Sequence, residues 1–182
     1  MTDVAAPRRR VVCQCGSLRR VSAHLAALEA ARELAPRCLQ LELYVHARSL
    51  PLFDPDVEAG PLPQAVRELR KAVGCADALL VACPEYAHGI PGAFKNLLDW
   101  LVGALEFPGK PVLLLNTSAR GSHHAQDALV EVLATMSARL LSSDPLPVRL
   151  AGSGCNVESV LGSDDRRREI ELALGVLAAS LA

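Results

Sequence analysis

The chain of 182 residues has few aromatic residues, almost no net charge and no long apolar run. It contains one Trp, two Tyr and three Phe although 51% of its residues are hydrophobic, so aliphatic side chains must build the core. The formal net charge of −1 argues against broad electrostatic binding to nucleic acid or to anionic membranes. No stretch approaches ~18 consecutive apolar residues, so no transmembrane helix is expected. We therefore expect neither a nucleic-acid partner nor a membrane partner.

The chain also lacks the signals of an exported or disulfide-bonded protein. Its first ten residues, MTDVAAPRRR, contain no apolar segment that could act as a secretory signal. The six cysteines include no CxxC pair that would favour a zinc or redox site. We expect all six to be reduced in the cytoplasm. Residues 1–9 are expected to be a flexible leader, and residues 10–182 a single domain, because this length is typical of one domain.

Short apolar runs alternate along the chain with longer stretches of helical periodicity. Strands are predicted at residues 11–15, 39–45, 78–83, 111–115 and 147–150. Helices are predicted at residues 22–34, 64–73, 91–101, 125–141 and 164–181. The alternation predicts an α/β fold, with a five-stranded parallel sheet and helices on both faces. Residues 49–63 hold four prolines, which indicates a long loop, and such loops are often functional lids.

Ligands of open α/β sheets bind beyond the carboxyl ends of the strands, which directs attention to three loops. The loop after the first strand has the sequence GSLRRVSAH at residues 16–24. Gly16 permits a tight turn, and the hydroxyls, guanidinium groups and free helix N–H groups suit a phosphate monoester. The loop is neither a GxGxxG nor a Walker A sequence. The alternative is that Ser22 only caps the helix and that the two arginines are solvated.

The other two loops are also chemically unusual. The loop after the third strand combines prolines and glycines over residues 84–92, so its stiff backbone can face a planar ligand. Its continuation supplies four expected core residues: Phe94, Leu97, Leu98 and Trp100. The loop after the fourth strand, residues 116–124, offers small polar residues and backbone donors. His123 and His124 lack further ligands at a recognisable spacing, which favours a solvated pair over a metal site.

Together the three loops resemble those of the NADPH-dependent FMN reductase family, flavodoxin-like enzymes that include quinone, azo-dye and chromate reductases. The family's G-S-x-R-x-x-S-x-N loop is matched at residues 16–24, with His24 in place of the asparagine. Its P-E-Y-x-x-G-x-P-G-x-x-K-N-x-x-D-W motif is matched at every fixed position of residues 84–100. Gly121 and Ser122 stand where two glycines are common. The resemblance extends from residue 10 to residue 150.

The resemblance implies a flavodoxin-like three-layer sandwich, non-covalent FMN, and NADPH or NADH as the electron donor. It implies that FMN N5 carries the hydride in ping-pong reduction of quinones, azo dyes, chromate or free flavin, without a catalytic side chain. A homodimer or homotetramer in the cytoplasm is implied as well. The implied phosphate ligands are Ser17, Arg19, Ser22 and His24. The residues implied along the ribityl chain and the ring are Pro84, Glu85, Tyr86, Ala87, His88, Gly89, Ser118, Arg120, Gly121 and Ser122.

Three alternatives remain. A flavodoxin-type electron carrier is usually strongly acidic and clamps the flavin between aromatic rings, which this composition disfavours. A relative that has lost FMN is conceivable because of His24 and Ser122. A low-molecular-weight phosphatase-like enzyme would use Cys13 and Arg19, which have the C-x₅-R spacing of that class. However, Cys13 lies two residues inside the predicted strand, where an activated thiolate is not expected.

Overall fold

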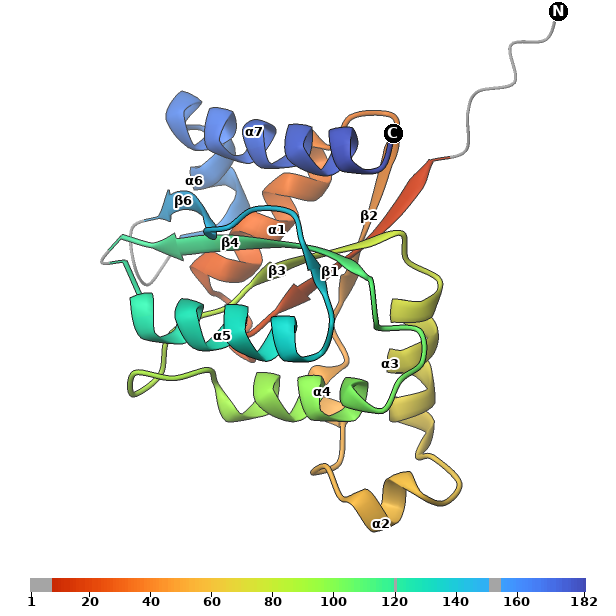
Figure 1. The fold of residues 1–182 in the computed structure, drawn as a ribbon. Coiled ribbons are helices and arrows are strands. Elements are labelled where there is room, and N and C mark those ends of the chain that lie inside the picture. The colour runs from red at the N-terminus through yellow and green to blue at the C-terminus, as the bar shows by residue number, and fades with distance from the viewer. Residues whose placement is uncertain (1–7, 120, 151–154) are drawn as a thin grey trace, which may run out of the picture.

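The computed structural model describes residues 8–119, 121–150 and 155–182, which form a parallel sheet between two layers of helices (Figure 1). The strands are β1 (Arg9–Cys15), β2 (Leu39–Tyr44), β3 (Ala78–Ala82), β4 (Pro111–Ser118), β5 (Arg139–Leu140) and β6 (Leu146–Leu150). Their order is β2-β1-β3-β4, and both β5 and β6 pair with the free edge of β4. All of these pairings are parallel, as predicted.

The helices cover both faces of the sheet. On one face lie α1 (Ala23–Leu34), α6 (Val157–Leu161) and α7 (Asp164–Ser180), and on the other lie α3 (Gln64–Gly74), α4 (Gly92–Val102) and α5 (His123–Thr135) (Figure 1). The short helix α2 (Pro55–Glu58) and the 3-10 helix η1 (Ala47–Ser49) lie between β2 and α3. This arrangement confirms the predicted three-layer α/β fold. No helix in the described part of the chain is long and apolar enough to cross a membrane.

Helix α4 supplies the aromatic part of the core. Phe94, Leu97, Leu98 and Trp100 are each at most 1% exposed, which confirms their predicted role. The Trp100 ring meets that of Phe53 edge-on, with the ring centroids 5.0 Å apart. Its indole N–H donates to the Pro51 carbonyl at 2.8 Å. The segment after β2 is therefore bound to the outer surface of α4.

The segment of residues 49–63 lies against α4 in this structure. Asn96 of α4 accepts a hydrogen bond from the Phe53 N–H at 2.7 Å and donates to the Pro51 carbonyl at 2.9 Å. These bonds, with that of Trp100, satisfy backbone groups that a loop would otherwise expose. Residues 49–63, all of them described, line neither the cavity of about 690 Å³ nor the cavity of about 620 Å³ at the carboxyl edge of the sheet. Asn96 and Trp100 of α4 thus hold this segment away from that edge.

The chain after β4 differs most from the prediction. Helix α5 ends at Thr135 rather than at residue 141, because Ser137 adopts a left-handed φ of 62° and turns the chain back. Residues 139–140 then pair with the start of β4, and β6 pairs with its end. Strand β6 is the fifth strand predicted at residues 147–150, whereas β5 lies at the end of the stretch predicted as helix, so the described sheet has six strands rather than the predicted five. Strand β4 itself extends to Ser118, three residues beyond its predicted end.

Helix α6 was not predicted. The Asn156 side chain accepts a hydrogen bond from the Ser159 N–H at 2.9 Å, and the Ser159 hydroxyl accepts one from the Asn156 N–H at 3.2 Å. This reciprocal pair is a capping box in which serine replaces the usual Glu or Gln. The short Asn-x-x-Ser spacing was the available signal for this helix.

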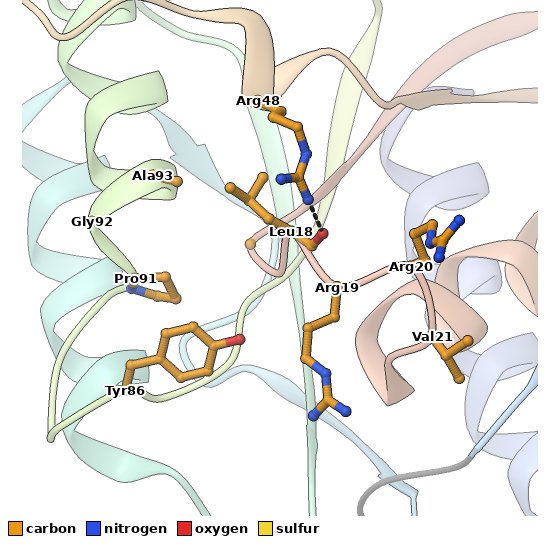
Figure 2. A pocket seen from close by; sticks show the side chains of 10 residues that line it. Leu18, Arg19, Arg20, Val21, Arg48, Tyr86, Pro91, Gly92 and Ala93 are labelled. Carbon is orange, nitrogen blue, oxygen red and sulfur yellow. Dashed lines mark hydrogen bonds between the residues drawn. The ribbon is translucent and has the colours of Figure 1, made fainter.

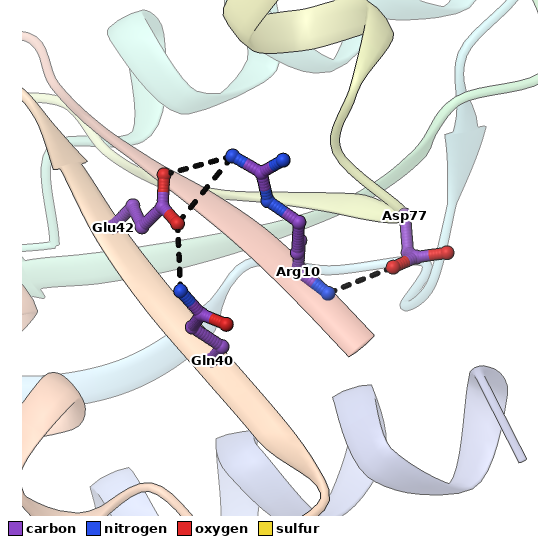
Figure 3. A network of polar contacts seen from close by, with 4 residues as sticks. All are labelled: Arg10, Gln40, Glu42 and Asp77. Carbon is purple, nitrogen blue, oxygen red and sulfur yellow. Dashed lines mark hydrogen bonds and ion pairs between the residues drawn. The ribbon is translucent and has the colours of Figure 1, made fainter. Parts of the chain in front are cut away.

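Polar contacts join the amino ends of three strands (Figure 3). The Arg10 N–H donates to the Asp77 carboxylate at 2.7 Å, and the Arg10 guanidinium lies 3.2 Å from the Glu42 carboxylate. Gln40 also donates to Glu42, at 2.9 Å. These groups are solvent-exposed, so they align the strands more than they stabilise them. Strand β1 begins at Arg9, which the prediction had assigned to the flexible leader. Residues 1–7 of that leader lie outside the described residues.

Gly16 allows the loop after β1 to lie against the end of β3. Its N–H donates to the Ala82 carbonyl at 2.8 Å. A Cβ at this position would lie 2.7 Å from Cys83 Sγ and 3.0 Å from Pro84 Cδ. Because such contacts force the backbone apart, Gly16→Ala is expected to lower the free energy of unfolding by ~1–3 kcal/mol, measured by urea denaturation.

Gly175→Ala is the matched control, because Gly175 is exposed within α7 and a new Cβ would meet nothing within 4 Å. This substitution is expected to raise the free energy of unfolding by about 0.5–1 kcal/mol through helix propensity. If Gly16→Ala were as stable as the wild type, the close approach of the two loops would be contradicted.

Candidate cofactor site

A cavity of about 620 Å³ lies where the loops after β1, β3 and β4 meet. Its described lining comes from all three loops, as the position of ligand sites in open α/β sheets predicts. Nine of the fourteen predicted cofactor residues line it: Ser17, Arg19, Ser22, His24, Pro84, Glu85, Tyr86, Ser118 and Ser122. Ala87, His88, Gly89 and Gly121 do not, and Arg120 lies outside the described residues.

The loop after β1 gathers hydroxyl and guanidinium groups at the start of α1. Ser17 is buried, and its hydroxyl accepts a hydrogen bond from the Arg19 N–H at 3.2 Å. Ser22 is the N-cap of α1, and its hydroxyl accepts from the Leu25 N–H at 3.1 Å. The Ser17 hydroxyl also lies 3.4 Å from the Tyr86 hydroxyl, and either of the two can be the donor. Together with the first N–H groups of α1, which have no partner within the helix, the Ser17 and Ser22 hydroxyls form a polar end of the cavity that suits an anion.

The charge at this end comes from Arg19 rather than from His24. Arg19 is exposed and makes no ion pair with a carboxylate in the described part of the chain. His24 lies in the first turn of α1, half-buried, and burial lowers its pKa to about 4. Its imidazole is therefore neutral at pH 7 and offers hydrogen bonds without charge.

A tight turn follows β3 at the opposite wall. Tyr86 and Gly89 exchange two backbone hydrogen bonds of 3.0 Å, and Ala87 and His88 between them have φ values of 49° and 61°. Two positive φ values at the central residues are those of a primed hairpin turn, which normally uses Asn and Gly. The turn places Tyr86 on the cavity wall with its hydroxyl 3.4 Å from the Ser17 hydroxyl. The next three residues turn away from the cavity.

Glu85 connects this loop to α5. Its carboxylate accepts a hydrogen bond from the Ala125 N–H at 3.0 Å, which satisfies a free donor in the first turn of α5. The Gln126 amide donates to the Cys83 carbonyl at 3.1 Å. Sequence reasoning missed Gln126, which is only 3% exposed. The sequence signal that could have identified Gln126 is its position as a polar residue on the apolar face of the predicted helix.

The loop after β4 is held by Asn116. Its side-chain oxygen accepts from the Ser118 N–H at 3.0 Å, and its side-chain nitrogen donates to the Gly121 carbonyl at 2.6 Å. Gly121 has a φ of 99°, and a Cβ there would collide with the His123 ring, so glycine is required. Ser122 takes a left-handed φ of 45° where the family often has glycine. His123 and His124 are exposed in the first turn of α5.

Thr117 is a site residue that sequence reasoning also missed. It lines the cavity and is 2% exposed, and its hydroxyl has no hydrogen-bond partner among the described residues. Such an orphaned buried hydroxyl is uncommon, and at the wall of a cavity it can pair with a polar group of a ligand. The prediction missed Thr117 because it ended the strand at residue 115, so the alternation of faces along β4 was not followed to this position.

The phosphatase alternative is contradicted by the position of Cys13. This residue is 1% exposed within the core, and burial raises its pKa to about 12. A nucleophilic cysteine must be a thiolate near neutral pH, so Cys13 cannot serve as one. All six cysteines are free, as predicted.

Comparison with known proteins identifies related oxidoreductases. The sequence model of the NADPH-dependent FMN reductase family matches residues 9–149. The NAD(P)H-dependent FMN reductase of Pseudomonas aeruginosa is 35% identical over 159 residues, 85% of each chain. A 2-hydroxy-1,4-benzoquinone reductase of Burkholderia sp is 29% identical over 175 residues, 93% of this chain and 94% of the relative.

A solved structure of an oxidoreductase also matches this fold. FerB of Paracoccus denitrificans, a flavoenzyme NAD(P)H:(acceptor) oxidoreductase, matches with a TM-score of 0.73 and 25% identity over 95% of both chains. The fold comparison confirms the predicted flavodoxin-like class, and the family match confirms the predicted class of flavin-dependent oxidoreductases. The matched region includes all three loops that form the cavity. The chain belongs to the NADPH-dependent FMN reductase family.

Proposed function

We propose that this protein is an NAD(P)H-dependent oxidoreductase that holds FMN non-covalently in the 620 Å³ cavity and passes electrons to small acceptors such as quinones. The observation that carries the proposal is the convergence of three loops on one cavity with a polar end that suits an anion. The activities named for the relatives, FMN reduction and benzoquinone reduction, support it. The alternation of donor and acceptor in one place makes the expected kinetics ping-pong.

The polar end of the cavity fits the phosphate of FMN. Ser17, Ser22 and His24 offer neutral donors, and Arg19 offers a charged fork that suits phosphate oxygens. The positive end of the α1 dipole adds to this attraction. His24 occupies the asparagine position of the family loop and, being neutral, supplies a hydrogen bond of similar kind.

The middle and the far wall of the cavity fit the rest of the cofactor. The buried Thr117 hydroxyl, which has no partner among the described residues, fits a ribityl hydroxyl. Pro84 and the half-exposed Tyr86 present apolar surface on the opposite wall. Bound FMN supplies the two-electron redox chemistry, and the protein binds and orients it. Glu85 is the one carboxylate of the described lining, and we assign it a positioning role because it caps α5.

We further propose a cytoplasmic homodimer or homotetramer, as the resemblance implies. Large aliphatic side chains near α2 and the end of α4 support an interface, since Leu52 is 85%, Val102 63% and Leu105 93% exposed. Sedimentation equilibrium is expected to give at least twice the monomer mass of 19.3 kDa. A monomer at micromolar concentration would contradict this proposal.

The purified protein is expected to bind FMN and to lose its yellow colour when NADPH is added without oxygen. Yellow protein that does not bleach would indicate an electron carrier, and protein that cannot bind added FMN would indicate a relative that has lost the cofactor.

Arg19→Ala is expected to weaken FMN binding by roughly 1–3 kcal/mol, measured by flavin fluorescence, because a charged hydrogen bond is lost.

Arg37→Ala is the matched control for Arg19→Ala. Arg37 is exposed between α1 and β2, at the opposite end of the sheet from the site, and its removal changes the net charge equally. FMN affinity is expected to stay at the wild-type value. Equal affinities of the Arg19→Ala and Arg37→Ala proteins would refute the phosphate-loop assignment.

The lowered pKa of His24 predicts a pH-dependent stability of the FMN-free protein. The unfolded chain takes up a proton near the ordinary pKa of 6.5, whereas the folded chain takes it up only near 4. The stability contribution of neutral His24 is thus complete above pH 6.5 and is lost as the pH falls toward 4. Urea denaturation of His24→Asn is expected to show a smaller loss over this interval. An identical loss in both proteins would contradict the burial of His24.

A further inference from the structure

A second cavity of about 690 Å³ adjoins the cofactor cavity (Figure 2). Arg19, Val21 and Tyr86 line both cavities. The Tyr86 hydroxyl lies 3.4 Å from the Ser17 hydroxyl, so Tyr86 stands at the boundary between them. A molecule in the second cavity therefore lies directly beside the occupant of the first.

The second cavity is strongly cationic. Its described lining contains three arginines, Arg19, Arg20 and Arg48, and no carboxylate. Arg48 donates to the Leu18 carbonyl at 2.6 Å, which fixes its guanidinium against the phosphate loop (Figure 2). The ion pairs of arginine in the described part of the chain all involve Arg9, Arg10, Arg70 and Arg168 instead. Three uncompensated guanidinium groups around one cavity attract an anion.

The remaining wall is apolar. Figure 2 shows Tyr86, Pro91 and Ala93 on the side opposite the loop that carries Arg19 and Arg20. Tyr86 is half-exposed, so its ring is available for contact with a ligand. The cavity thus combines a surface for a planar or apolar group with guanidinium forks that match phosphate oxygens. A phosphate-bearing nucleotide has this combination of groups.

We propose that Arg20 and Arg48 bind phosphate groups of the nicotinamide donor and make the enzyme prefer NADPH to NADH. The proposal rests on the proposed function, because it places the donor beside the cofactor cavity. The two donors differ only in the 2′-phosphate, so a guanidinium that contacts this group favours NADPH alone. Arg19 is set aside from this role because the FMN phosphate engages it.

The test compares FMN-loaded wild type with Arg20→Ala, Arg48→Ala and the control Arg37→Ala. Calorimetry gives the dissociation constants of NADP⁺ and NAD⁺, and steady-state kinetics with an uncharged benzoquinone gives kcat/KM for NADPH and NADH. Each pocket variant is expected to lose about 3- to 5-fold in NADP⁺ affinity and in kcat/KM for NADPH, which is the upper part of the range for one exposed charged contact. For the same variants, the NAD⁺ dissociation constant and kcat/KM for NADH are expected to change by less than about twofold. The control Arg37→Ala is expected to leave the values for both donors unchanged.

Two further measurements sharpen the comparison. Arg48→Lys keeps the charge and is expected to retain more NADP⁺ affinity than Arg48→Ala. Raising the salt concentration is expected to weaken NADP⁺ binding more than NAD⁺ binding, because exposed charges are screened. Arg20→Ala guards against an indirect effect, since Arg48→Ala also removes the hydrogen bond to the Leu18 carbonyl whereas no such bond of Arg20 exists within the described residues.

Equal losses for the two donors would overturn the proposal. So would variants that bind NADP⁺ normally but lose activity only with an anionic acceptor, such as a sulfonated naphthoquinone, when NADH is the donor. In that case the arginines would recognise the acceptor. Failure of the proposed function is distinguishable: neither donor would then bleach FMN-loaded wild type, whatever the difference between NADP⁺ and NAD⁺ affinities.

Discussion

The close approach of Gly16 to the end of β3 is the constraint on which the site depends. The loops after β1 and β3 touch there because Gly16 has no side chain to hold Cys83 and Pro84 away. This contact brings the Ser17 hydroxyl of one loop to 3.4 Å from the Tyr86 hydroxyl of the other. Glu85 of the loop after β3 accepts a hydrogen bond from the Ala125 N–H in the first turn of α5. This bond connects the loop after β3 to the helix that follows the loop after β4. The relative positions of the three loops around the cavity thus depend on this contact.

The fold was largely predictable from the sequence because hydrophobic periodicity reports burial directly. The fully buried β3 reads as a continuous apolar run, and α1, α3 and α7 show helical spacing. The failures occurred where backbone geometry overrides periodicity. Ala138 and Leu140 continue the helical pattern of α5, but the left-handed Ser137 ends it, and no side-chain rule marks serine for that conformation. Helix α6 was missed because one short capping box carries little weight in a sequence.

The site was predictable at the level of loops but not of side-chain roles. The sequence placed Ser17, Arg19 and Ser22 at a phosphate-binding turn, and the structure brings them to one cavity. It did not reveal that the Glu85 carboxylate is engaged by α5, since that partner lies 40 residues away. Thr117 was overlooked because β4 was predicted to end at residue 115. Without the continuation of the strand, the face of the sheet on which Thr117 lies could not be assigned.

The attachment of residues 49–63 to α4 has a consequence for access to the carboxyl edge of the sheet. Asn96 and Trp100 hold this segment through backbone hydrogen bonds, so its displacement is not required for a molecule to enter or leave the carboxyl edge of the sheet. The side chains that line the second cavity at that edge include Arg19, Arg20 and Arg48. Their positive charge attracts anions, so charge can select among the molecules that reach this edge.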